Sequence, residues 1–211
     1  MKKTRTNKIR PTIKIAGSTI LAALAVIFQL LPPIFVTPWQ MRIDLVAIPW
    51  ILCWIIFGLK PAILSMLISA PLVGFIGPIA GGWVGAIMKS TATIWMFLIP
   101  AILSWKIGGT KQLLNDRRLF LVASIIAIIV RAFVTVIFNF YFALPFFFYM
   151  SPSDIITLFS NVTIFGISGL GAFIAEVSIW NTVQAIIDLI ASFIIGVIIL
   201  RRLPELNVKN K

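Results

Sequence analysis

The side chains that could do chemistry in this sequence stand at helical spacing inside its most apolar segments. Two such sets are Arg131, Thr135 and Asn139, and Asn181, Gln184 and Asp188. Because four residues advance a helix by about 400°, side chains at this spacing share one face. An ionisable side chain inside a membrane span costs at least about 3 kcal/mol unless it is paired or faces water. The spacing therefore predicts hydrogen-bonding positions for a ligand or for neighbouring helices.

The residue inventory argues against catalysis. The chain has no histidine, and Cys53 is its only cysteine, which excludes disulfide frameworks, Cys/His zinc sites and Ser/His/Asp triads. Its six carboxylates are spread along the sequence without a close pair. No GxxxxGK[ST] motif for nucleotide phosphates occurs. We therefore predict a protein that is not an enzyme and that uses no metal and no cofactor.

The composition is that of an integral membrane protein. Hydrophobic residues make up 60% of the 211 residues, the mean hydropathy is +1.08, and charged residues are held to 11%, compared with about 25% in soluble domains. The net charge of +12 would suggest nucleic-acid binding in a soluble protein, but the basic residues gather at 2–14, 106–118 and 201–211, beside the apolar segments. Basic loops are typical of the cytoplasmic side. We expect both termini to be cytoplasmic and no nucleic-acid partner.

The apolar segments predict an all-α polytopic membrane protein in the prokaryotic plasma membrane, because about 20 apolar residues cross a bilayer as a helix. The six predicted transmembrane helices are 12–31, 44–59, 61–79, 82–105, 119–145 and 180–200. They form a single membrane domain over 1–211, preceded by a basic cytoplasmic tail at 1–11. An external loop at 146–179, a candidate lid, holds glycines that interrupt helices and a short interfacial helix that we expect Ser153 to cap.

The polar positions converge at one depth in this topology. Those predicted to lie in the outer half of the membrane are Lys89, Asn139, Asn181, Gln184 and Asp188. We expect a polar cavity between the fourth, fifth and sixth helices, open to the outside and walled by aromatic rings. The ring-bearing candidates are Trp83, Trp95, Phe138, Tyr141, Phe142 and Trp180. Flat aromatic walls with a few polar anchors suit a planar ligand that contains rings.

A structural interpretation of the same residues stays open. Polar side chains in spans join helices through hydrogen bonds worth about 0.6–2 kcal/mol each, and Asp188 could neutralise Lys89 or Arg131 as a structural pair. We expect Asn139 to face a ligand, and Arg131 and Thr135 to hold helices together below it.

The first predicted helix has small residues at four-residue spacing. Its two pairs are Ser18 with Ala22, and Thr19 with Ala23. Such pairs allow another helix to approach closely. They predict either packing within this chain or a docking face for a separate membrane subunit.

Four segments together resemble the substrate-binding S component of energy-coupling-factor vitamin transporters, and are most similar to its riboflavin-specific members. These segments are RIDLVAIPWILCWIIFG at 42–58, GGWVGAIMKS to LIPAILSWK at 81–106, VRAFVTVIFNFYFALPFF at 130–147 and IWNTVQAIIDLIASFIIGVIILRRL at 179–203. The resemblance implies a six-helix vitamin-binding subunit whose partners are a transmembrane coupling subunit and two cytoplasmic ATPase subunits. It also implies that Asn139 and Asn181 hydrogen-bond the ligand and that the small residues of the first helix face the coupling subunit.

The sequence departs from this family pattern in its last span. Gln184 stands where the family has Lys, and Asp188 has no counterpart in the pattern. A glutamine can still donate to a ring carbonyl of a flavin. A carboxylate could instead select a positively charged, thiamin-like vitamin. Three hypotheses follow: a riboflavin-binding S component, an S component for another vitamin, or a structural membrane protein whose polar residues only pack.

Overall fold

The computed structural model describes residues 9–37, 41–76, 82–203 and 206. The first eight residues of the predicted basic tail, the last residues of the predicted span 61–79, and the C-terminal lysines lie outside this part of the chain. The elements are α1 (Pro11–Leu30), β1 (Phe35–Val36), β2 (Arg42–Ile43), α2 (Ala47–Phe57), α3 (Leu59–Ile76), α4 (Gly82–Lys106), α5 (Thr110–Asn115), α6 (Arg117–Phe138), the π-helix η2 (Asn139–Ala143), α7 (Leu144–Phe148), α8 (Pro152–Ser160) and α9 (Leu170–Arg202).

Within the part of the chain that the structure describes, five helical stretches are long and apolar enough to cross a membrane. They are α1, α3, α4, the continuous run from α6 through α7, and α9. The predicted all-α fold of a polytopic membrane protein is confirmed, and five of the six predicted spans correspond to helices of full spanning length.

The second predicted span, 44–59, is different. The helix α2 has 11 residues, which at about 1.5 Å per residue is roughly half the thickness of the hydrocarbon core. Every one of its residues, including Cys53, is buried. Its length is limited at one end by Asp44, whose carboxylate accepts from the Val46 N–H, and at the other by Gly58 with a φ of 93°. The helix α2 is therefore a core element and does not face lipid.

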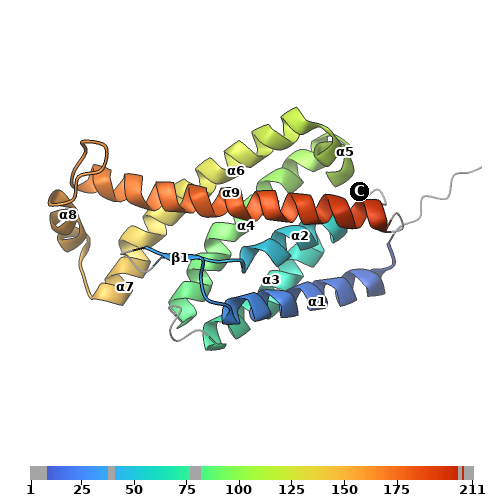
Figure 1. The fold of residues 1–211 in the computed structure, drawn as a ribbon, viewed down its shortest axis with the longest axis horizontal. Coiled ribbons are helices and arrows are strands. Elements are labelled where there is room, and N and C mark those ends of the chain that lie inside the picture. Colours follow the sequence, from blue (N-terminus) through green and yellow to red (C-terminus); the bar gives the residue numbers. More distant parts are fainter. Residues whose placement is uncertain (1–8, 38–40, 77–81, 204–205, 207–211) are drawn as a thin grey trace, which may run out of the picture.

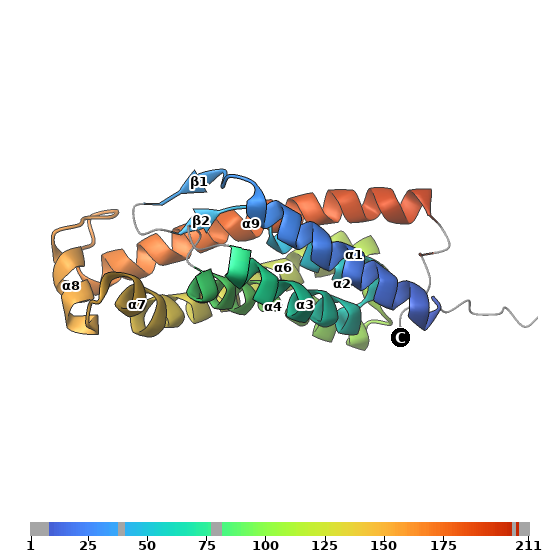
Figure 2. The ribbon, with the colours of Figure 1, turned by 90° about the horizontal axis from the view of Figure 1, so that it is seen from below.

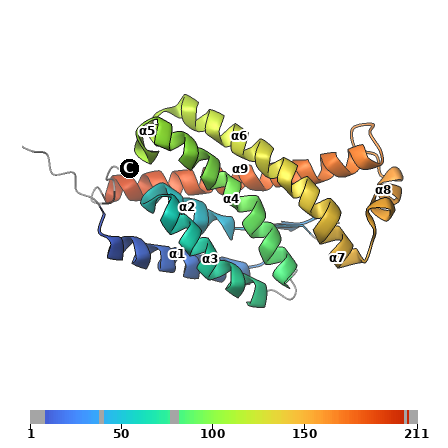
Figure 3. The ribbon, with the colours of Figure 1, turned by 180° about the vertical axis from the view of Figure 1, so that it is seen from behind.

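The helices form two layers with α2 between them. The helices α3, α4 and α6 lie side by side across one face (Figure 3), whereas α1 and α9 lie on the other. The short helix α2 contacts α1, α3, α4 and α9. Close approach depends on glycine: a Cβ built on Gly196 of α9 would lie 2.7 Å from Ile55 Cγ2, and one on Gly17 of α1 would clash with the Phe57 ring.

The two ends of the molecule differ in charge. The start of α1, the helix α5 and the end of α9 lie together at the end marked C in Figure 1. We call this the basic end, because it carries Lys60, Lys106, Lys111 and the arginines that close α9. The opposite end holds α7 and α8. This arrangement agrees with the expectation that both termini lie on one side of the membrane.

The predicted external loop at 146–179 is largely helical. The helix α9 begins at Leu170 and not at residue 180, because Gly169, with a φ of 63°, forms its N-cap. Within the loop α8 is capped by Ser151 and not by Ser153: the Ser151 hydroxyl accepts from the Asp154 N–H and donates to the Asp154 carboxylate. The Ser151 backbone N–H donates to the same carboxylate. The hydrogen bond from the hydroxyl, and to a smaller extent the one from the backbone N–H, lowers the pKa of Asp154 below its usual value.

The fifth predicted span, 119–145, also has different limits. Regular α-helix runs from Arg117 to Phe138, where the Asp116 carboxylate caps its start by accepting from two backbone N–H groups. The helical run then continues as η2 and α7. It ends at Tyr149, which adopts a left-handed conformation and forms the C-cap of α7. A π-helix is a single widened turn that is frequent at functional sites.

Candidate ligand-binding site

A two-stranded hairpin brings the segment after α1 against α9. Phe35 of β1 pairs with Ile43 of β2, and Figure 2 shows both strands beside α9. The Phe35 ring stacks on Trp180 at a centroid distance of 5.0 Å, and the Trp180 indole N–H donates to Glu176 over 2.8 Å. Trp180 therefore anchors the hairpin at one edge of the site.

Asp44, directly after β2, is the centre of a polar cluster. Its carboxylate forms an ion pair with Lys89 of α4, and the Lys89 ammonium also donates to the Gln29 side chain of α1 over 2.6 Å. Three elements that are distant in the sequence are thus joined by one lysine. Both charged side chains are largely buried, with 17% and 12% exposed.

Gln184 of α9 fastens the backbone of Asp44. The Gln184 amide donates to the Asp44 carbonyl over 2.8 Å and to the Asp188 carboxylate over 2.7 Å. Its oxygen accepts from the Asp44 N–H over 3.0 Å. Both amide N–H groups are used in this way, so Gln184 positions the hairpin and leaves no N–H for a ligand.

A second ion pair lies deeper in the cluster. Arg131 of α6 donates to Asp188 of α9 over 3.1 Å, and neither side chain is more than 4% exposed. The prediction that Arg131 holds helices together is confirmed, as is the alternative that pairs Asp188 with it. The prediction for Thr135 is wrong: among the described residues its hydroxyl donates to the Arg131 and Ala132 carbonyls of its own helix and to no second helix.

The two predicted asparagines have similar local bonding. The Asn181 side-chain N–H donates to Val177 O over 2.9 Å, and that of Asn139 donates to Thr135 O over 2.7 Å. Asn181 also contacts the Met41 sulfur of the hairpin at 3.7 Å. Among the described residues, neither asparagine side-chain oxygen has a hydrogen-bond donor. Each amide can therefore offer an acceptor to a bound molecule.

The structure brings several of the predicted site residues together, whereas the one hydrogen bond of the Asn139 side chain among the described residues is to Thr135 of its own helix and none joins it to this group. Lys89, Gln184 and Asp188 belong to the polar cluster around Asp44, and Asn181 lies beside the hairpin. Tyr141 is 68% exposed and rests edge-on against Phe140 of η2. Its predicted place in the aromatic wall is not observed, because the widened π-turn after Phe138 changes the direction in which the following side chains point.

Sequence reasoning missed two members of the cluster. Asp44 lies in the segment 42–58, which carries part of the family resemblance, but it is absent from the predicted site residues, although it connects Lys89 and Gln184. Gln29 was not noticed, although it is the one amide side chain in α1 and is 8% exposed. An amide in an otherwise apolar span is a signal that could have identified it.

Of three comparisons with known proteins, the one with solved structures found a match. No protein-family model matches the sequence, and a search of curated proteins found no match. The structure is similar to that of the S component of a bacterial ECF transporter, with a TM-score of 0.62 and 20% sequence identity. The similarity covers 92% of this chain and 97% of that chain. At this identity, the comparison establishes that the two proteins share a fold.

Proposed function

We propose that this chain is the vitamin-binding S component of an energy-coupling-factor uptake transporter and that its ligand is riboflavin. Its partners would be a transmembrane coupling subunit and two cytoplasmic ATPase subunits. The observation that carries the proposal is the buried polar cluster around Asp44, which ties the hairpin to α1, α4 and α9 in a fold shared with an S component. Buried polar groups of this kind inside a membrane fold favour a binding role.

The charges of the cluster favour an uncharged ligand. Lys89 pairs with Asp44, and Arg131 pairs with Asp188, so two cations face two anions. The carboxylate that could have selected a thiamin-like cation, Asp188, is engaged by Arg131 and Gln184. A flavin ring is uncharged, and its N–H can donate to the side-chain oxygen of Asn139 or Asn181, neither of which has a donor among the described residues.

Purification and titration test this proposal. We expect the protein, purified in detergent, to carry flavin absorption bands or to bind added riboflavin with quenching of tryptophan fluorescence. Asn181→Ala and Asn139→Ala should each weaken binding about 10-fold, since a lost hydrogen bond to a desolvated ligand is worth about 1.5 kcal/mol. Asn115→Ala in α5, at the basic end, is the matched control and should bind as the wild type does.

The alternatives give different results in the same experiment. Saturable quenching by thiamin without any response to riboflavin would assign the site to another vitamin. Failure of both ligands to bind a folded protein would favour a structural role for the polar cluster.

The structure separates the two small-residue pairs of α1. Ser18 and Ala22 are buried, with the Ser18 hydroxyl 3.9 Å from the Cys53 sulfur of α2. This pair therefore packs within the chain. Thr19 and Ala23 are exposed on a neighbouring face of α1, about 100° around the helix. We extend the proposal to this face, which would dock the coupling subunit through the close approach that small residues allow.

Ala23→Leu tests the docking face. We expect vitamin uptake by cells that carry the complete transporter to fall about 10-fold or more, because a large side chain prevents close helix contact. Riboflavin affinity of the purified variant should be unchanged, since Ala23 lies outside the polar cluster. Val122→Leu, on the exposed face of α6, controls for added bulk. Normal uptake with Ala23→Leu would refute docking at this face.

A further inference from the structure

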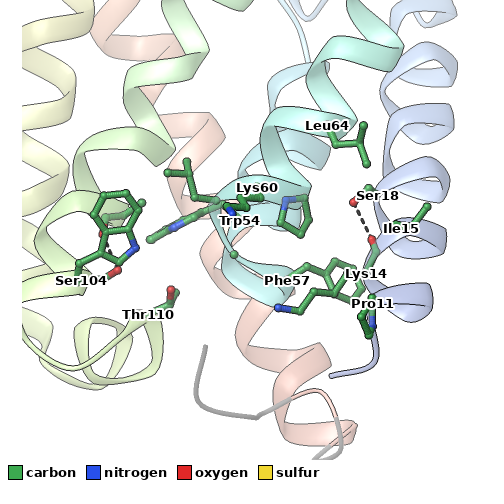
Figure 4. A pocket seen from close by; sticks show the side chains of 15 residues that line it. Pro11, Lys14, Ile15, Ser18, Trp54, Phe57, Lys60, Leu64, Ser104 and Thr110 are labelled. Carbon is green, nitrogen blue, oxygen red and sulfur yellow. Dashed lines mark hydrogen bonds between the residues drawn. The ribbon is translucent and has the colours of Figure 1, made fainter. Parts of the chain in front are cut away.

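A cavity lies at the basic end, and none of the residues of the polar cluster lines it. Its volume is about 440 Å³, and it is lined by residues of α1, α2, α3, α4 and the start of α5. In Figure 4, Lys14 and Ser18 of α1 stand on one side, Ser104 and Thr110 stand on the other, and Trp54 lies between them. Neither the proposed vitamin site nor the proposed docking face includes this cavity.

The charge of the lining favours an anion. Lys14 and Lys60 are its charged residues, and no carboxylate is among the side chains that line it. Thr110 adds a hydroxyl group on the far wall, next to Ser104, whose own hydroxyl donates to the Ala101 carbonyl over 2.7 Å. Lysine ammonium groups and hydroxyls together are a common setting for phosphate oxygens.

Trp54 gives an independent indication of a ligand. Its side chain is 0% exposed, and its indole N–H has no acceptor among the described residues. A buried donor without a partner is rare in folded proteins. Because Trp54 lines the cavity, an oxygen atom of a bound molecule can supply the missing acceptor.

The cavity also has an apolar side. Ile15 is 58% exposed, Leu64 is 37% exposed and Trp105 is 62% exposed, and all three line it. At about 1.5 Å per residue, Leu64 lies one turn from Lys60 along α3, toward the membrane interior. Tryptophan and lysine at span ends are typical of the headgroup region of the bilayer.

We propose that this cavity binds an anionic phospholipid. Its phosphate would lie beside Lys14 and Lys60, an ester oxygen would accept from Trp54, and an acyl chain would follow Ile15 and Leu64. Basic groups at the cytoplasmic surface attract anionic lipids in general. A lipid accounts for the anionic and apolar parts of the cavity together, whereas a partner helix would need a groove extended over several turns.

Lipid binding to the purified full-length protein tests the proposal. Native mass spectrometry should show about one retained phosphatidylglycerol, and this lipid should raise the thermal unfolding temperature by several °C, because a ligand that binds only the folded state stabilises it. Phosphatidylcholine should do neither. Lys60→Gln should weaken retention about 10-fold, and Trp54→Phe should do so while keeping an aromatic ring at this position.

A matched variant and two opposing outcomes complete the experiment. Lys111→Gln removes an exposed lysine of α5 that does not line the cavity, so this variant should retain phosphatidylglycerol like the wild type. Equal binding of both lipids, or unchanged binding by folded Lys60→Gln, would overturn the proposal. Photo-crosslinking from position 64 in native membranes that captured protein and no lipid would also overturn it, in favour of a partner subunit.

Discussion

Asp188→Leu should lower the free energy of unfolding by about 3–5 kcal/mol, which is the largest stability effect that we expect from a single substitution in the polar cluster. The change leaves the Arg131 guanidinium buried and without its counter-ion. It also removes the acceptor of one Gln184 N–H. Reversible unfolding in mixed detergent micelles, followed by circular dichroism, measures the loss.

The double variant identifies the cause of this loss. Adding Arg131→Met to Asp188→Leu should recover most of the stability, because an apolar pair of similar volume carries no unpaired buried charge. Arg118→Met, the same substitution at an exposed position of α6, should be nearly neutral. A loss below about 1 kcal/mol for Asp188→Leu alone would show that the buried ion pair does not operate as described.

Gln184→Met should reduce riboflavin affinity by about 10- to 100-fold without unfolding the protein. The substitution keeps the volume of the side chain but removes all three hydrogen bonds of Gln184, two of which fasten the backbone of Asp44. The hairpin and Lys89 then lose their fixed position beside α9. Fluorescence titration of purified protein measures the affinity.

The matched control for this prediction is Gln112→Met at the basic end. Gln112 lies in α5, and among the described residues none of the hydrogen bonds of the polar cluster involves it, so its replacement should leave the affinity unchanged. If Gln184→Met bound riboflavin as tightly as the wild type, positioning of the hairpin by Gln184 would not be needed for binding.

Hydrophobicity and charge were sufficient to predict the fold class. Long apolar runs predict the spanning helices because each must satisfy its own backbone in lipid. The short helix α2 could not be predicted in this way, since its sequence is as apolar as that of a span. Its length depends on where the backbone at Asp44 is held, and that is set by Gln184, 140 residues later.

Contacts within one helix of the candidate site could be predicted from the sequence, whereas contacts between distant segments could not. Helical spacing placed Asn181, Gln184 and Asp188 on one face of α9, as the structure confirms. Spacing could not show that Asp44 connects Gln184 to Lys89, because that contact is tertiary. Tyr141 was misplaced because a regular period of 3.6 residues does not describe the π-turn of η2.

Because α2 is buried, cysteines can be introduced elsewhere for site-specific labelling without first removing the native cysteine. Cys53 is the only cysteine of the sequence and is 0% exposed within α2. A thiol without access to solvent does not react with maleimide or methanethiosulfonate reagents. A cysteine placed on the hairpin, or on α8, would therefore carry a spin label or fluorophore alone. With one such cysteine on the hairpin and another on α8, the distance between the two labels can be followed without altering the core.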